Sequence, residues 1–167
     1  MTSVAADHPA AHVLTWDDIA ATAEAMAAKV LADGVPDVVV AVLRGGVIPA
    51  VLLSHQLGVR TVRTVEIIHT TTDGVNAEKT VHPQVINPAS LGRLVGADVL
   101  IVDDIAGSGD TGECAADLVS AAGAARIRTA VCVVNTGNWH RTQPPEQELT
   151  YVGATVTGWV TFPWEQR

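Results

Sequence analysis

The chain has 167 residues, of which 48% are hydrophobic and 4% aromatic, and its formal net charge is −8. This length suits one domain covering 1–167, with a core built from aliphatic side chains. The acidic balance argues against a nucleic-acid partner or an anionic membrane surface, although a local basic pocket for phosphate stays compatible with it. No apolar run reaches the ~18 residues of a membrane span, and no secretion signal is present. We therefore expect a cytoplasmic protein.

The N-terminal part predicts a tail, a helix and a buried strand. Residues 1–11 are small or polar and predict a poorly ordered tail. Residues 19–31 carry apolar side chains at helical spacing, and either Thr15 or Asp17 can cap this helix. The continuous apolar, β-branched run at 38–43 predicts a buried parallel strand.

A glycine-rich turn follows that strand. Arg44, Gly45 and Gly46 lead into a helix expected at 51–56. Paired glycines let the backbone approach an anion closely, and a guanidinium is a bidentate phosphate donor. The segment is therefore a candidate phosphate site, although by itself it is equally compatible with a plain turn.

A long polar segment lies between two expected strands, at 59–68 and 84–87. Residues 69–83 include Gly74 and are too many for a passive turn, so we expect a flexible lid loop. Lys79 and the threonines at 70–72 are its candidates for contact with a ligand; the alternative is a solvated loop tip.

The most informative stretch is 99–111. Its first apolar residues, 99–102, predict a fully buried strand. Asp103 and Asp104 follow at the carboxyl end, where an open α/β sheet holds its ligands. The next residues form a loop whose backbone N–H groups can converge on an anion before a helix that starts near Gly112. These loop residues are Ala106, Gly107, Ser108, Gly109, Asp110 and Thr111. The pattern predicts a sugar-phosphate site; the alternative is a buried strand with a chance capping turn.

The C-terminal part adds a helix at 114–122, a strand at 126–134 and a polar loop at 135–145. Residues 151–165 contain the only Phe and two of the four Trp. Such a concentration of aromatic residues indicates a packing cap or a stacking platform for a flat ring. The histidines and cysteines show no metal-ligand spacing, so we expect no histidine-ligated metal.

Together, these motifs resemble the type I phosphoribosyltransferase family, and the pattern is closest to the xanthine-guanine (6-oxopurine) enzymes of bacteria and archaea. The resemblance rests on the acidic pair with its Ser-Gly-x-Thr loop, the Arg-Gly-Gly-x-x-Pro turn at 44–49, and the segment Trp159-Val-Thr-Phe-Pro-Trp164. It implies an α/β fold with a doubly wound, mainly parallel sheet, a flexible lid loop and a small hood formed by terminal segments, with 151–165 over the base. It also implies a cis peptide bond between Leu43 and Arg44.

The resemblance implies transfer of the 5-phosphoribosyl group of phosphoribosyl pyrophosphate (PRPP) to a nitrogen of a heterocyclic base, namely a purine or a purine-like base. Arg44, Asp103 and Asp104 would be the catalytic residues, and Mg²⁺ the cofactor, held by Asp104 and mostly by substrate. PRPP would be bound by Arg44, Gly45, Gly46, Lys79, Asp103, Asp104, Ala106, Gly107, Ser108, Gly109, Asp110 and Thr111. Asn135, Trp159 and Val160 would contact the base. Relatives form dimers or tetramers, which implies a homo-oligomer.

Two positions depart from the family pattern. The 6-oxopurine enzymes carry an Asp that exchanges a proton with purine N7 where this chain has Gly107, and a Lys that donates to purine O6 where it has Asn135. Both changes concern the base, whereas the PRPP-binding parts are intact. Three hypotheses stay open: a purine enzyme that uses another carboxylate such as Asp110 or Glu113, an enzyme for a 7-deazapurine, or a PRPP-binding regulator without turnover.

Overall fold

A computed structural model describes residues 11–70 and 78–165 of the chain. Its centre is a six-stranded sheet in the order β4-β3-β2-β5-β6-β7. Five strands run parallel and the edge strand β4 is antiparallel to β3. The strands are β2 (Val38–Leu43), β3 (Val62–Thr70), β4 (Lys79–Val85), β5 (Asp98–Ala106), β6 (Arg126–Asn135) and β7 (Tyr151–Val156).

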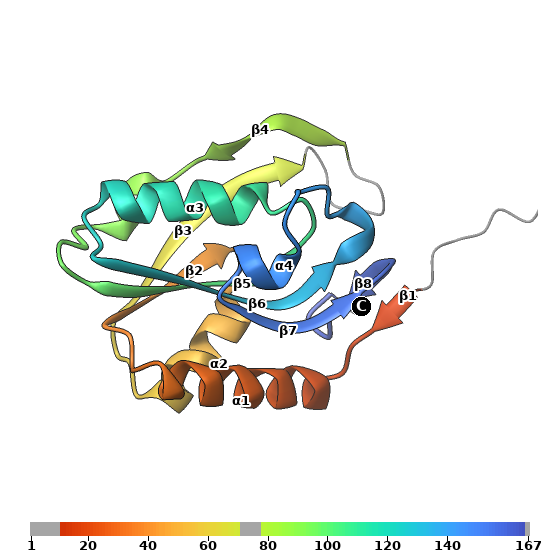
Figure 1. The fold of residues 1–167 in the computed structure, drawn as a ribbon, viewed down its shortest axis with the longest axis horizontal. Coiled ribbons are helices and arrows are strands. Elements are labelled where there is room, and N and C mark those ends of the chain that lie inside the picture. Colours follow the sequence, from red (N-terminus) through yellow and green to blue (C-terminus); the bar gives the residue numbers. More distant parts are fainter. Residues whose placement is uncertain (1–10, 71–77, 166–167) are drawn as a thin grey trace, which may run out of the picture.

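Helices cover both faces of the sheet, which confirms the doubly wound fold. α3 (Asp110–Ala121) lies on one face, and α1 (Trp16–Ala32) and α2 (Val47–Leu57) lie on the other (Figure 1). The central strands β2 and β5 are therefore buried on both sides, as their continuous apolar sequences predict. Short helical segments occur at α4 (Pro145–Glu148) and at the 3₁₀ turns Pro88–Leu91 and Thr136–Asn138.

α1 begins at a capping box. The side chain of Thr15 accepts a hydrogen bond from the backbone N–H of Asp18, and the Asp18 carboxylate accepts one from the N–H of Thr15, at 2.8 Å. Thr15, rather than Asp17, is therefore the cap, because only Thr15 can satisfy a backbone donor of the first turn in this way. The apolar stripe of α1 then buries Ile19 and Met26 against the sheet.

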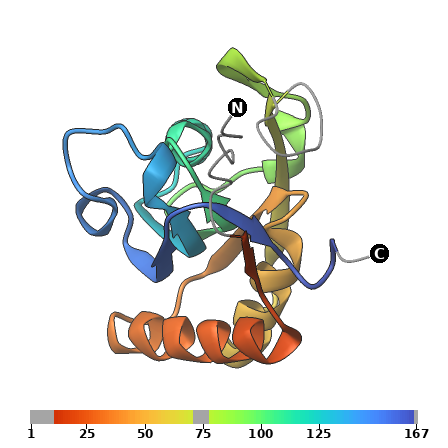
Figure 2. The same cartoon turned by 90° about the vertical axis from the view of Figure 1, so that its right-hand side faces the viewer.

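The two ends of the described chain meet in a second, two-stranded sheet. β1 (Ala11–Val13) pairs in parallel with β8 (Trp159–Thr161). This pair lies beyond the end toward which the parallel strands point (Figure 1), and Figure 2 shows it in front of the main sheet. Trp164 packs on it, stacked on Phe162 with ring centroids 4.7 Å apart. We call β1, β8 and residues 162–165 the hood.

Three expected boundaries change. Ala11 belongs to β1 rather than to a tail, because β8 offers it a pairing partner. Tyr151–Val156 forms β7 of the main sheet rather than part of the hood, because the open edge of β6 accepts it. The segment expected as a lid is strand from Lys79 onward, where Pro83 is tolerated because β4 is an edge strand. Residues 1–10 and 71–77 of the expected tail and lid lie outside the described residues.

Helix starts also differ from expectation. α3 begins at Asp110 rather than near Gly112, because Gly109 adopts a left-handed φ of 85° and turns the chain into the helix. α2 begins at Val47, directly after the glycine turn, and Pro49 fits its first turn. Among the described residues, no helix is both long and apolar enough to cross a membrane.

Candidate functional site

The motifs expected to bind ligand meet at the carboxyl ends of β2 and β5. These strands are neighbours in the sheet, so the turn after β2 faces the acidic pair of β5. A pocket of about 230 Å³ lies there. Its lining is Val42, Leu43, Arg44, Gly45, Ile67, His69, Thr70, Asp103, Asp104, Ile105 and Thr111. The structure thus brings together residues from three separate expected segments.

The turn after β2 packs directly on β5. A Cβ atom on Gly45 would overlap the carboxylate of Asp104, and one on Gly46 would overlap backbone carbonyl oxygens of both strands. The turn is held by a hydrogen bond from the Gly46 N–H to the Val42 carbonyl, at 2.9 Å. The peptide bond between Leu43 and Arg44 is cis, as expected. Both glycines are therefore required by close packing, which the sequence alone could not show.

The acidic pair is desolvated. Asp104 is 9% exposed, and its carboxylate accepts a hydrogen bond from the Ile105 N–H at 2.8 Å. The pKa of Asp104 is raised to about 6, chiefly by burial and in smaller part by the negative charge of Glu165 in the hood, while the hydrogen bond from Ile105 opposes the rise. Burial, followed by the neighbouring charge of Asp104, also raises the pKa of Asp103. A cation or the hydroxyl groups of a ligand would relieve this unfavourable burial of charge.

The first residue of α3, Asp110, is a tethered carboxylate beside the loop that follows β5. Asp110 accepts hydrogen bonds from the hydroxyl of Ser108, at 2.7 Å, and from Arg141, at 3.2 Å. These contacts lower the pKa of Asp110, and the hydrogen bond from Ser108 has the largest effect. A carboxylate held as an anion is a poor proton acceptor, which weakens the hypothesis that Asp110 replaces the missing general base.

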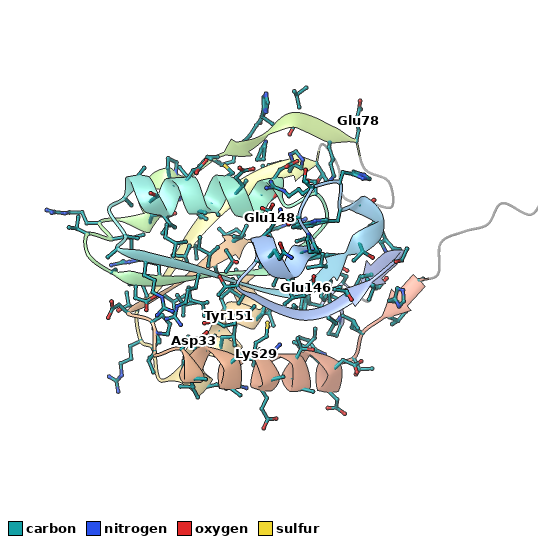
Figure 3. The ribbon with its side chains drawn as sticks, viewed as in Figure 1. Lys29, Asp33, Glu78, Glu146, Glu148 and Tyr151 are labelled. Atoms are coloured by element: carbon teal, nitrogen blue, oxygen red, sulfur yellow. The ribbon has the colours of Figure 1, made fainter. Side chains whose placement is uncertain are left out.

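Arg141 connects this loop to the segment after β6. It donates Nε–H to the Ser108 carbonyl at 2.8 Å and forms ion pairs with Asp110 and with Glu113, the latter at 2.7 Å. A third carboxylate, Glu148 on α4, lies 3.4 Å away (Figure 3 labels it). Sequence reasoning missed Arg141, because nothing local distinguishes it from other polar residues of the loop at 135–145. Glu113, the other carboxylate considered as a replacement general base, is engaged in its ion pair with Arg141.

Lys79 reaches the same loop from β4. Its Nζ lies 3.5 Å from the Ser108 hydroxyl and 3.7 Å from where a Cβ on Gly107 would be. Thr70 lines the pocket, whereas Thr71 and Thr72 lie outside the described residues. Lys79 is therefore beside the phosphate-loop candidate, although it belongs to a strand and not to a loop.

The three residues expected at the base lie in or beside the hood. Asn135 donates to the Gly158 carbonyl at 2.7 Å, and its side-chain oxygen accepts from the Gly137 N–H at 3.1 Å. Most of its amide is thus used to anchor the turn before β8. Trp159 is half-buried, and Val160 is buried in pairing with β1. Within the described part of the chain, none of the three lines the pocket beside Arg44.

The phosphoribosyl transferase domain family matches residues 10–166. The chain belongs to this family. The xanthine-guanine phosphoribosyltransferase of Gluconobacter oxydans is 31% identical over 157 residues, which are 91% of this chain and 83% of that one. The corresponding protein of Ruegeria sp. is 28% identical over 158 residues, with 91% and 84% covered. A crystal structure of a purine phosphoribosyltransferase from Pyrococcus horikoshii has a TM-score of 0.71 at 30% identity, and 94% of this chain and 95% of that one are covered.

Purine phosphoribosyltransferases generally use Mg²⁺ together with PRPP, and the acidic pair of this chain fits such an ion. Asp103 and Asp104 supply adjacent buried carboxylates, the oxygen donors that Mg²⁺ prefers. The described residues contain no group of three or more acidic, histidine or cysteine side chains arranged to hold a metal.

Gly107 marks where this phosphoribosyltransferase differs from the family pattern. The side chain nearest to it is Asn138, whose Cβ lies 3.4 Å from where a Cβ on Gly107 would be. The position thus has an amide and the Lys79 ammonium beside it, and no carboxylate of its own. Asn138 was not expected from the sequence, because only the fold brings the segment after β6 over the loop after β5.

Proposed function

We propose that this phosphoribosyltransferase transfers the 5-phosphoribosyl group of PRPP to a ring nitrogen of a purine or purine-like base, giving a nucleoside 5′-monophosphate and pyrophosphate. The observation that carries the proposal is the packing of the Arg44–Gly45 turn against the carboxylate of Asp104. This packing forms one pocket from a phosphate-binding turn and a pair of carboxylates, which are the groups that a phosphorylated sugar needs.

The pyrophosphate end would be held by the turn after β2. Negative charge accumulates on the leaving pyrophosphate, so donors fixed in advance at that end lower the barrier. Arg44 would supply a guanidinium there, and Gly45 and Gly46 their backbone N–H groups. Mg²⁺ bound by Asp104 and by the substrate would neutralise part of the same charge.

The ribose and the 5′-phosphate would lie along β5 and the loop after it. Asp103 and Asp104 would accept hydrogen bonds from the ribose hydroxyls. The N–H groups of 106–111 and the N-terminus of α3 would bind the 5′-phosphate, with the ammonium group of Lys79 beside them. Thr111 adds a hydroxyl donor to the same site, whereas the Ser108 hydroxyl already donates to Asp110 and Ser108 would contribute its backbone N–H.

The base would lie under the hood, whose Glu165 carboxylate is near enough to Asp104 for its charge to raise the pKa of that group. The indole of Trp159 would stack on the ring and the Val160 backbone would lie at its edge. Asn135 has one N–H beyond its hydrogen bond to Gly158, so its contribution to base recognition would be limited to that donor. Since Gly107 provides no carboxylate, a 7-deazapurine, which has no N7 to protonate, is the alternative acceptor.

The test is pyrophosphate release from PRPP and Mg²⁺ with hypoxanthine, guanine, xanthine, adenine and a 7-deazapurine. We expect release with at least one of them, and its loss in Asp104→Asn. Binding of PRPP without release in the presence of any base would contradict the proposal. Release with the 7-deazapurine alone would select the alternative acceptor.

A further inference from the structure

A histidine with no role in the proposed chemistry lines the pocket. His69 lies near the end of β3, with 12% of its side chain exposed. Its Nε2 is 3.5 Å from a carboxylate oxygen of Asp110, the first residue of α3. Its Nδ1 is buried and has no hydrogen-bond partner among the residues that the structure describes.

This environment favours a neutral imidazole. A charged ring would carry a proton on Nδ1, and a buried N–H without a partner is unfavourable by about 1–3 kcal/mol. The groups around it act in both directions on its pKa: burial, the Lys79 ammonium and His82 lower it, Asp110 raises it, and the net result is a lowered pKa. The neutral ring then has its proton on Nε2, the nitrogen that faces Asp110.

The Nε2–H group makes no hydrogen bond of ordinary length to Asp110. A separation of 3.5 Å from Asp110 is longer than the 2.7–3.2 Å typical of an N–H···O hydrogen bond. Asp110 already accepts from Ser108 and Arg141 at shorter distances. A donor therefore lies beside Asp110, the first residue of α3, in a pocket that Thr111 also lines.

We propose that His69 is a phosphate-binding residue, which donates its Nε2–H to the 5′-phosphate of PRPP when that group occupies the loop before α3. The inference rests on the proposed function, because it needs PRPP as the ligand. A neutral donor suits this position, since it binds a phosphate oxygen without attracting the Asp110 carboxylate as strongly as a cation would. It thereby adds a contact from β3 to a phosphate site built otherwise from the β5–α3 loop, the N-terminus of α3 and Lys79 of β4.

Calorimetry with three ligands tests this: PRPP with Mg²⁺, ribose 5-phosphate, and pyrophosphate with Mg²⁺. For His69→Leu we expect about tenfold weaker binding of ribose 5-phosphate and PRPP, the effect of one lost hydrogen bond to a charged group. Binding of pyrophosphate should change less than about twofold. His69→Gln, which keeps a neutral N–H donor, should bind within about threefold of the wild type. The matched control is His55→Gln, an exposed histidine on α2 that does not act on His69, and it should leave the affinity for all three ligands unchanged.

The outcomes separate this inference from the proposed function. Wild-type affinity for ribose 5-phosphate in His69→Leu would overturn the role of His69, and so would a loss confined to pyrophosphate. An equal loss of affinity for ribose 5-phosphate in His69→Gln and His69→Leu would contradict the claim that His69 acts as a neutral N–H donor. Failure of the wild type to bind PRPP at all would instead contradict the proposed function. Should His69→Leu not fold, ¹⁵N NMR of the wild-type imidazole decides: ribose 5-phosphate must shift Nε2 and leave Nδ1 unprotonated, and an unperturbed ring contradicts the proposal.

Discussion

The carboxylate of Asp104 lies directly against the backbone of Gly45, so that no side chain fits between them. The acidic pair of β5 and the turn after β2 are consequently positioned by each other. A change on either side displaces the other, and both the stability of the pocket and its affinity for PRPP should respond together.

Gly45→Ala tests this coupling most directly. The added methyl group would overlap the Asp104 carboxylate, so either the turn or the carboxylate must move. Overpacking of this kind is unfavourable by about 1–3 kcal/mol. We expect a lower melting temperature and at least about a tenfold rise in the KM for PRPP, measured by thermal unfolding and by pyrophosphate release.

The matched control is Gly112→Ala in α3. A Cβ on Gly112 has no atom within 4 Å, and the residue lies inside a helix. Alanine should therefore stabilise the protein by about 0.5–1 kcal/mol. Its KM for PRPP should stay within about twofold of the wild type. Equal behaviour of the two alanine variants would contradict the proposed coupling.

Asp104→Asn should stabilise the unliganded protein and impair its activity. The folded protein raises the pKa of Asp104 from 3.8 to about 6, which disfavours the charged form in the folded state. The contribution of this group to stability is therefore complete below pH 3.8 and is lost as the pH rises through about 6. The loss amounts to about 3 kcal/mol at most. Asparagine avoids this loss of stability because it carries no charge, but for the same reason it binds a cation less well than a carboxylate does.

Urea unfolding at pH 4, 6 and 8, without Mg²⁺ or PRPP, measures the effect. The advantage of Asp104→Asn over the wild type should be largest at pH 8 and small at pH 4. Turnover with PRPP should fall by about 10²-fold or more, as for the loss of an electrostatic group in a desolvated site. A variant that is less stable than the wild type at pH 8 would show that Asp104 is not strained by burial.

Local sequence patterns predicted the parts of the site that lie next to one another along the chain. The apolar runs of β2 and β5 specify buried strands, and the residues directly after them reach the ligand side of any parallel sheet. His69, Asn138 and Arg141 could not be found in this way. Each contacts the β5–α3 loop only because the order of strands places β3 and β6 beside the central pair.

Contacts between residues far apart in the sequence could not be predicted from local patterns either. β1 pairs with β8, although the two strands are separated by almost the whole length of the chain. Each strand has only three residues, which is too short for a sequence pattern that would predict the pairing. Arg128 on β6 is 2% exposed, although arginine is rarely buried without a partner. It is held by the carboxylate of Asp98 and by the hydroxyl of Tyr151, which in turn donates to Asp33; Figure 3 shows these last two residues side by side. Only the assembled sheet reveals these partners.

Arg141→Met should weaken binding of the 5′-phosphate without removing any expected ligand contact. The arginine holds the Ser108 carbonyl and the Asp110 carboxylate in place, and methionine keeps only its packing. Asp110 would keep its hydrogen bond from Ser108 but lose its cationic partner beside an incoming phosphate, so repulsion should add to the loss of order. We expect a KM for PRPP about tenfold higher, with pyrophosphate affinity unchanged. Arg141→Lys retains the charge but not the forked geometry of the guanidinium, so its KM for PRPP should lie between those of the wild type and Arg141→Met. Equal KM values for all three proteins would contradict this role.

Gly107→Asp should restore proton transfer to an N7-bearing purine. The space is sufficient, because a Cβ there would lie 3.4 Å from Asn138 and 3.7 Å from the Lys79 ammonium, which can shift slightly. A positioned general base contributes about 10²–10⁴-fold to a rate. The nearby ammonium makes the carboxylate less basic, so we expect a gain of about tenfold in kcat/KM for hypoxanthine or guanine. Gly107→Asn is the matched control, because it has the same size and no acid–base function. A gain in both variants would indicate a packing effect, and no gain in Gly107→Asp would favour an acceptor that needs no proton transfer at N7, such as a 7-deazapurine.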